Sequence, residues 1–151
     1  MKKIHKIIAA LCLSDHTVDV LDNAATLARQ FDAELLLVNV VNVRDLRHVA
    51  TIQTMGYDMS VDEYKRRMKE EHREKMDDFT KAIDFPREKL KQLVTIGHPV
   101  ERILEVVKEE GADLLVIGVK GRSNLPDLLV GSVAEKLFRH SPVTVVSVRT
   151  R

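Results

Sequence analysis

The chain has 151 residues, of which 44% are hydrophobic and 31% are charged, so we expect one globular domain spanning residues 1–151. Its 24 Lys and Arg residues against 23 Asp and Glu residues leave no basic excess, which argues against nucleic acid or an anionic membrane surface as a partner. Cys12 is the only cysteine, which excludes an intramolecular disulfide, a CxxC redox pair and a multi-thiolate metal site and favours a reducing, cytoplasmic setting.

The first predicted element is a buried strand from Ile4 to Leu13. Basic residues precede this apolar run, as in a signal peptide, but the run is short and has no clear small-residue cleavage site. No segment approaches the length of a membrane span. Residues 14–17 are rich in helix-capping side chains, and we interpret Ser14 as a cap rather than a nucleophile. They predict a helix from about Val18 to Phe31.

The middle of the chain continues with a second buried strand from Leu35 to Val43, whose near-continuous Leu and Val content predicts a parallel sheet covered on both faces. Arg44 to Ser60 shows neither helical nor strand periodicity, so we predict a mobile loop there. A long charged helix with one apolar stripe is predicted from Val61. His72 lies on that stripe, and we expect it to be partly buried rather than catalytic.

The C-terminal half completes the alternation of strands and helices. A helix stripe from Val100 ends at Gly111, a residue typical of helix C-termini. The other predicted elements are strands at Leu90–Ile96, Leu114–Ile117 and Val143–Val148 and a helix at Ser132–Arg139. The alternation predicts an α/β fold with a single doubly wound, Rossmann-like sheet of five parallel strands and helices on both faces. Ligands are expected beyond the carboxyl ends of the strands, where the winding reverses.

A glycine-spaced loop follows the fourth predicted strand, with Gly118, Gly121 and Gly131-Ser132 in the spacing Gly-x2-Gly-x9-Gly-Ser. Glycine lets backbone approach a ligand closely and adopt dihedral angles that other residues avoid. Gly131-Ser132 opens a helix, whose free N–H groups favour an anion, and phosphate is the natural anion. The spacing is neither a Walker P-loop nor a GxGxxG after the first strand, which disfavours a dinucleotide enzyme.

Side chains in the same loop fit phosphate, although a plainer interpretation exists. Lys120 and Arg122 add positive charge at the mouth of the loop. The Ser132 hydroxyl can donate to a phosphate oxygen or cap the helix. Glycines are also common in turns, so the spacing alone leaves both interpretations open.

Together with Val133-Ala134-Glu135-Lys136 and Ser141–Val146, the glycine motif resembles the sequence pattern of universal stress proteins. Residues 97–103 and 111–118 resemble the unit joining the third and fourth strands of that family, and the likeness extends over nearly the whole chain. The resemblance implies a regulatory or protective binding protein of the ATP-binding subgroup. It also implies a homodimer joined through the last strand, Val143 to Val148.

The resemblance also assigns binding roles. It implies that the nucleotide is ATP, ADP or AMP, with Mg²⁺ or Mn²⁺ as the cation accompanying it. The phosphates would rest on backbone at four positions, and Gly118 would lie beside the ribose. The first- and second-strand ends would contact adenine and ribose. The phosphate positions are Gly121, Gly131, Ser132 and Val133, and the strand-end positions are Ala10, Cys12 and Val40.

One position departs from the family pattern. Nucleotide binders of the family often carry Asp where this chain has Cys12, two residues before the serine that matches Ser14. A thiol is a weak hydrogen-bond partner, and losing a bond to a charged group costs about 1.5–3 kcal/mol, or one to two decades in affinity. Cys12 can also be interpreted as a reactive thiol or, more simply, as a small buried apolar residue.

Five further histidines lack metal-ligand spacing and are expected in loops or on the surface: His5, His16, His48, His98 and His140.

Two functional alternatives stay open at this stage. A slow ATPase would need a positioned metal and a water-activating base, and Asp127 is the only carboxylate inside the loop. A nucleotide-free protein would instead recognise a partner through the charged long helix and the 44–60 segment. The resemblance favours a binding module over either alternative.

Overall fold

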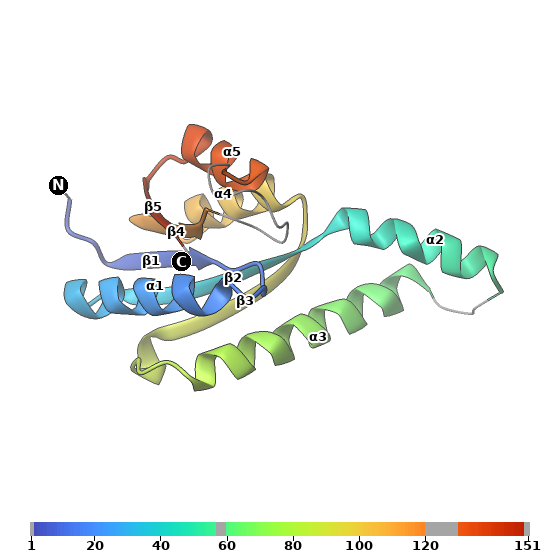
Figure 1. The fold of residues 1–151 in the computed structure, drawn as a ribbon, viewed down its shortest axis with the longest axis horizontal. Helices are drawn as coiled ribbons and strands as arrows, with labels where there is room; N and C mark the ends of the chain where they lie inside the picture. The colour runs from blue at the N-terminus through green and yellow to red at the C-terminus, as the bar shows by residue number, and fades with distance from the viewer. Residues whose placement is uncertain (1, 57–59, 120–129, 150–151) are drawn as a thin grey trace.

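Five parallel strands form one sheet in the order β3-β2-β1-β4-β5 (Figure 1). This computed structural model describes residues 2–56, 60–119 and 130–149. The chain winds outward from β1 to β3 and then returns to the other side of β1 with β4, so the winding reverses between β1 and β4. The predicted doubly wound parallel sheet is confirmed. The strands are β1 Lys6–Ala10, β2 Glu34–Asn42, β3 Leu90–Gly97, β4 Leu114–Gly118 and β5 Thr144–Val148.

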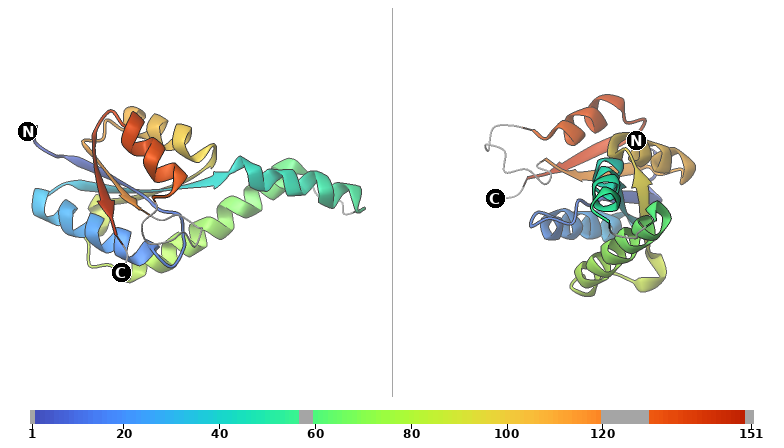
Figure 2. Two further views of the ribbon diagram at one scale, coloured as in Figure 1. Left: turned by 45° about the horizontal axis from the view of Figure 1, so that its top comes forward. Right: turned by 90° about the vertical axis from the view of Figure 1, so that its right-hand side faces the viewer.

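Helices cover both faces of the sheet, as Figure 2 shows from two directions. Side chains of successive strand residues point to opposite faces, so Ile7 and Ile8 of β1 enter different cores. Ile7 packs in the core under α1 (Thr17–Phe31) and α3 (Val61–Lys81), and Ile8 packs in the core under α4 (Pro99–Glu109) and α5 (Ser132–His140). Within the described ranges, no helix has the length and apolar character needed to cross a membrane.

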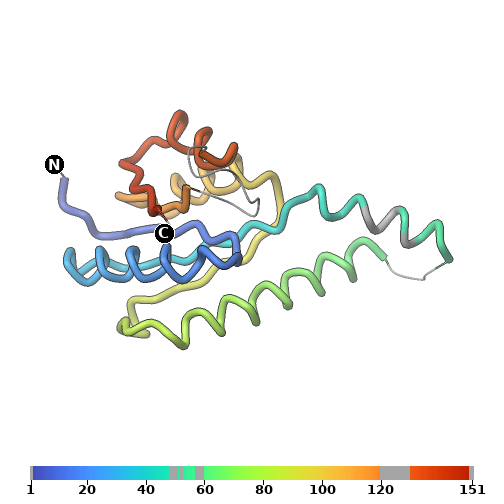
Figure 3. Tube along the Cα trace, in the orientation of Figure 1, coloured from blue at the N-terminus to red at the C-terminus, as the bar shows by residue number. Residues whose placement is uncertain are grey.

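The segment that follows β2 is helical, so the prediction of a mobile loop is wrong for residues 44–54, and Val43, predicted as the end of a strand, is the first residue of a helix. A 3-10 helix, η1 (Val43–Leu46), leads into α2 (Arg47–Thr54), and the Asn42 side chain caps η1 by accepting from the Arg44 amide at 3.0 Å. Figures 1 and 3 show α2 and the start of α3 extending beyond the sheet. A helix that does not lie on the core needs no apolar stripe, which is why periodicity did not reveal it.

An aspartate at the start of β4 fixes the amino ends of the central strands. Asp113 accepts hydrogen bonds at one carboxylate oxygen from the backbone amides of His5, at 2.8 Å, and Lys6, at 3.1 Å. The His5 amide, with help from the Lys6 amide, holds the pKa of Asp113 below its ordinary value. This anchor sets the register in which Ile7 lies opposite Leu114, so the carboxyl ends of β1 and β4 finish side by side.

The end of α4 follows the prediction closely. Gly111 lies just beyond the helix with φ of 60°, a left-handed conformation that favours glycine. Its amide donates to the Lys108 carbonyl at 3.2 Å, and the Ala112 amide donates to the Val107 carbonyl at 3.0 Å. These bonds satisfy helix-end carbonyls and turn the chain directly into β4.

Candidate functional site

A cavity of about 290 Å³ lies at the carboxyl edge of the sheet, over the point where the winding reverses. The ends of β1, β2 and β4 form its floor, and the first turns of α1, α4 and α5 contribute to its wall. Most of the lining is apolar. The lining residues are Ala10, Leu11, Cys12, His16, Thr17, Val20, Val38, Asn39, Val40, Asn42, Pro99, Ile103, Ile117, Gly118, Gly131, Ser132, Val133, Ala134 and Leu137.

Seven of the nine residues predicted to bind the nucleotide line this cavity. Three come from strand ends at its floor and four from β4 and the start of α5. The other two, Gly121 and Arg122, lie outside the described residues, as do Lys120 and Asp127. The seven lining residues are Ala10, Cys12, Val40, Gly118, Gly131, Ser132 and Val133.

The wall contributed by α5 begins at Gly131, which is the N-cap residue. Ser132 is therefore the first helical residue and not the cap. Gly131 has φ of −60° and ψ of 150°, a conformation that any residue adopts, and Gly118 does not have a positive φ. Close approach of a ligand, and not special dihedral angles, is the remaining reason for glycine here. Helix geometry leaves the amides of Ser132, Val133 and Ala134 free of intrahelical acceptors, so they can donate to an anion.

Two backbone hydrogen bonds close the base of the 120–129 segment. The Gly131 amide donates to the Val119 carbonyl at 2.9 Å, and the Val119 amide donates to the Val148 carbonyl at 3.1 Å. Val119 and Gly131, which flank residues 120–129, are thus held together at the end of β5. This pairing holds the N-terminus of α5 at the edge of the cavity.

The turn between β1 and α1 is tight, and its capping differs from the prediction. Leu13 has φ of 56°, a left-handed conformation that is unusual for leucine. The N-cap residue of α1 is His16, without a side-chain cap, so Ser14 is not the cap itself. The Ser14 side chain accepts from the His16 amide at 3.3 Å, and its carbonyl accepts from the Thr17 amide at 3.0 Å. These bonds turn the start of α1 towards the cavity.

Two buried polar atoms at the start of α1 have no hydrogen-bond partner in the described part of the chain. They are Nδ1 of His16 and Oγ1 of Thr17, and both residues line the cavity. We call these two atoms the α1 pair. Most buried polar groups in proteins are hydrogen-bonded, so the α1 pair requires an explanation. Sequence analysis missed both residues, since their only visible signal was membership of a capping cluster.

Cys12 is partly buried, and its Sγ lies 3.0 Å from Oγ of Ser14. It lines the cavity instead of filling the core. The thiol therefore sits where the resemblance implies a nucleoside contact. The interpretation as a fully buried apolar residue is wrong.

A buried polar chain connects the cavity floor to α3. Asn39 of β2 is 1% exposed, and its Nδ2 donates to the Leu11 carbonyl at 2.8 Å. Its Oδ1 lies 2.6 Å from Nδ1 of His72, which is also buried. His72 is thus more deeply buried than its position on the stripe predicted. Asn39 joins the end of β1, the cavity and the long helix.

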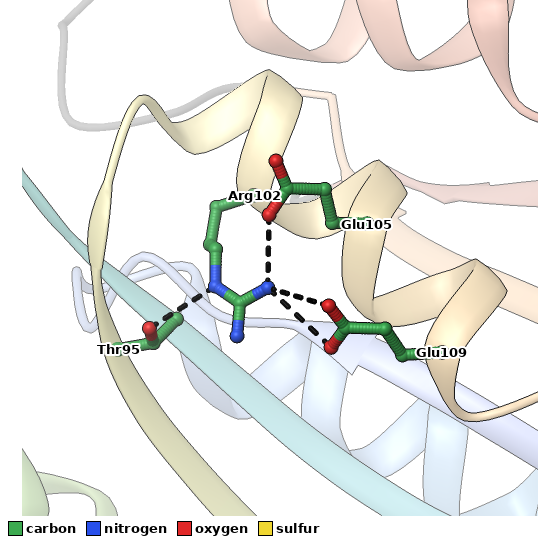
Figure 4. A network of polar contacts seen from close by, with 4 residues as sticks. All are labelled: Thr95, Arg102, Glu105 and Glu109. Carbon is green, nitrogen blue, oxygen red and sulfur yellow. Dashed lines mark hydrogen bonds and ion pairs between the residues drawn. The ribbon is translucent and has the colours of Figure 1, made fainter.

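The cation nearest in sequence to the start of α4 is already paired. Figure 4 shows Nε of Arg102 donating to Oγ1 of Thr95 at 3.2 Å and Nη1 pairing with Glu105, at 3.0 Å, and Glu109, at 3.3 Å. We call these four residues the Arg102 cluster. The residues that line the cavity in the described structure include no Lys, Arg, Asp or Glu. Positive potential there comes from the helix N-termini, which favours an anion at the rim.

Comparison with known proteins identifies the fold and its relatives. The universal stress protein family pattern matches residues 3–149. Universal stress protein MJ0577 of Methanocaldococcus jannaschii is 30% identical over 123 residues, which cover 75% of this chain and 76% of that protein. The solved structure of MJ0577 aligns with a TM-score of 0.76 at 25% identity and covers 99% of both chains.

Two other solved structures were determined with nucleotides bound to them. A universal stress protein in complex with cAMP aligns with a TM-score of 0.66 at 23% identity, covering 99% of this chain and 100% of that one. The universal stress protein of Archaeoglobus fulgidus in complex with dAMP aligns with a TM-score of 0.59 at 18% identity, covering 97% and 99%. At these identities the likeness establishes a shared fold.

Proposed function

The chain belongs to the universal stress protein family, and from that premise we propose that it binds an adenine nucleotide, ATP, ADP or AMP, in the cavity at the carboxyl edge of the sheet. It would act as a regulatory or protective binding module of the stress response, in the cytoplasm. The observation that carries the proposal is one apolar cavity bordered by the N-termini of α1, α4 and α5. Solved relatives with cAMP and dAMP support adenine as the base.

The two ends of the cavity suit the two ends of a nucleotide. Apolar side chains such as Val40, Ile103 and Leu137 offer a surface for a flat base. The free amides at the start of α5 suit phosphate. A volume of about 290 Å³ lies near the lower end of ligand cavities, roughly 300–1,000 Å³, so we expect the nucleoside inside and the phosphates at the rim.

The chemistry of the lining favours binding over hydrolysis. Its described residues include no carboxylate that could activate water or coordinate a cation. Mg²⁺ or Mn²⁺ would therefore arrive on the nucleotide phosphates, and we assign it no protein ligand. We accordingly propose a nucleotide-responsive binding protein.

Dimerisation is the second part of the proposal. β5 is an edge strand, paired only with β4 in the sheet, and its Val145 and Val146 are half-buried. An exposed edge strand with valines invites pairing, and a second copy of the chain would protect it. We propose a homodimer joined through β5. Sedimentation equilibrium would test this by measuring the mass of the species in solution.

Isothermal calorimetry with ATP tests the nucleotide site, with Gly131→Val as the decisive variant. Valine tolerates the Gly131 backbone conformation, so the fold is retained, but its side chain obstructs close approach to the helix amides. We expect the dissociation constant to rise about 100-fold, equivalent to losing about 2.7 kcal/mol. Unchanged ATP affinity in folded Gly131→Val protein would refute the phosphate site.

Gly97→Ala provides the matched control. Gly97 ends β3 away from the cavity lining, and an added methyl group would meet the Arg102 side chain at an ordinary contact distance of 3.5 Å. Its affinity for ATP should stay within twofold of the wild type. A comparable loss of ATP affinity in Gly131→Val and Gly97→Ala would indicate a general effect on the fold.

A further inference from the structure

The α1 pair is the most unusual polar feature of the cavity. Thr17 is 1% exposed, and the structure gives its hydroxyl no partner among the described residues. Nδ1 of His16, the preceding residue, is likewise a buried atom without a hydrogen-bond partner among the described residues. Leaving a buried donor or acceptor unpaired destabilises a protein, so such groups persist where another interaction compensates.

A second buried threonine shows that this fold is able to satisfy such a hydroxyl. Thr80 of α3 is 5% exposed, and its Oγ1 donates to the Asp77 carbonyl at 2.8 Å. The same oxygen accepts from Nε2 of Gln92 at 3.2 Å. Burial therefore does not by itself explain the unpaired hydroxyl of Thr17. The difference between the two is that Thr17 lines the cavity.

The chemistry of the pair specifies a kind of ligand group. A hydroxyl can donate one hydrogen bond and accept others, an imidazole nitrogen does one or the other, and neither group carries a permanent charge. The described lining has no charged side chain to compensate an ionised group beside them. The first amide of α1, that of Thr17, already donates to the Ser14 carbonyl at 3.0 Å, whereas the first amides of α5 are free to bind an anion. A neutral polar group, such as a sugar hydroxyl or the edge of a base, is the best complement. Phosphate is better placed at the start of α5.

Access to the Thr17 hydroxyl requires only a local change. Rotation about χ1 of threonine moves the hydroxyl and the methyl group between staggered positions. Because the side chain already lines the cavity, we expect a change of χ1 alone to present the oxygen to a ligand, without movement of the helix.

We propose that His16 and Thr17 recognise the nucleoside portion of the bound nucleotide through its neutral hydrogen-bonding groups. The proposal rests on the nucleotide-binding function proposed above and adds the residues that read the nucleoside. It also accounts for binding in a chain that has Cys12 where its relatives often have aspartate. The first turn of α1 supplies the nucleoside with hydrogen bonds that the weakly bonding thiol of Cys12 does not provide.

Calorimetry and thermal melting of Thr17→Val test the proposal. Valine keeps the branched shape and removes the hydroxyl. We expect the dissociation constant for ATP to rise about fivefold, the loss of one neutral hydrogen bond, while that for inorganic tripolyphosphate stays within twofold. Thr17→Ser, which keeps the hydroxyl, should bind ATP within twofold of the wild type. A parallel loss with dATP would assign the contact to the base or 3′-hydroxyl, and a loss with ATP alone would assign it to the 2′-hydroxyl.

The melting temperature of the ligand-free protein separates recognition from structure. Thr17→Val should melt at or slightly above the wild type, since it removes an unpaired buried hydroxyl. Thr80→Val should melt about 3 °C lower and bind ATP normally, since it breaks two hydrogen bonds away from the cavity. A lower melting temperature for Thr17→Val would overturn the proposal by giving the hydroxyl a structural role.

The binding results distinguish the two proposals. Wild-type protein that binds ATP, with unchanged affinity in Thr17→Val, would overturn the role of the pair and leave the nucleotide-binding function standing. Equal losses of ATP and tripolyphosphate affinity would overturn the nucleoside assignment. Wild-type protein that binds no ATP would overturn the proposed function and this inference with it.

Discussion

The Arg102 cluster and the α1 pair handle polar groups in opposite ways. Arg102 has three polar partners on β3 and α4, although its side chain is 24% exposed and could be hydrated. Thr17 is almost completely buried and has no partner for its hydroxyl in the described residues. Of these two side chains, the one that water could hydrate has protein partners, and the one that is sealed from water has none in the described residues. This contrast is the basis of our proposal that the start of α1 serves a ligand at the expense of local stability.

Replacing Asn39 by leucine should have the largest effect on this comparison. Asn39 is a buried polar group of the cavity floor that is fully engaged, with the Leu11 carbonyl and with His72. Its removal leaves both partners without this bond in a buried environment, so we expect the free energy of unfolding to fall by about 3 kcal/mol in urea denaturation. The result would show that partnered groups beside the cavity stabilise the fold.

Asn23→Leu is the matched control for that substitution. Asn23 lies on the exposed face of α1, and its side chain donates to the Asp19 carbonyl at 2.8 Å. The same chemical change there should alter the free energy of unfolding by less than about 0.5 kcal/mol. Similar losses at the two positions would mean that burial does not set the effect.

A new acceptor next to the α1 pair should have the next largest effect. In Cys12→Asp, a carboxylate replaces the thiol that contacts Ser14, and we expect calorimetry to show about tenfold tighter ATP binding, or about 1.4 kcal/mol. The affinity for tripolyphosphate should increase less, because this ligand has no nucleoside. Cys12→Ser should change ATP affinity by less than twofold. Folded Cys12→Asp protein with unchanged or weaker ATP binding would contradict the nucleoside contact.

Breaking the Arg102 cluster should have the smallest effect. Arg102→Met keeps much of the aliphatic side chain and removes ion pairs with two exposed glutamates, which should lower the free energy of unfolding by less than about 1 kcal/mol. Calorimetry should give ATP affinity within twofold of the wild type, because Arg102 does not line the cavity. A change above fivefold would show that the cluster and the cavity are coupled.

The sequence predicted the sheet well because each strand is determined by local apolar content. The near-continuous apolar run of β2 requires cover on both faces, and the structure provides α1 and α3 on one side and α4 on the other. Residues 44–54 were wrongly predicted as a loop because their helices extend away from the core, where no apolar period is imposed.

The lining of the cavity was predictable in part. Gly118, Gly131 and Ser132 stood out because their spacing follows from close backbone approach at a helix N-terminus. Thr17 and His16 did not stand out, because a missing partner is a property of the folded chain and leaves no pattern in the sequence. His72 and Asn39 were likewise joined only by packing of α3 on β2.

The hydrogen bonds of Val119 and Gly131 have a consequence for protein engineering. One bond joins residues 119 and 131 directly and the other ties residue 119 to β5, which makes these two positions suitable graft points. The entropy of closing a loop grows slowly, by about 0.6 kcal/mol for each doubling of its length. Segments of different length and composition exchanged between these points should therefore leave the sheet folded.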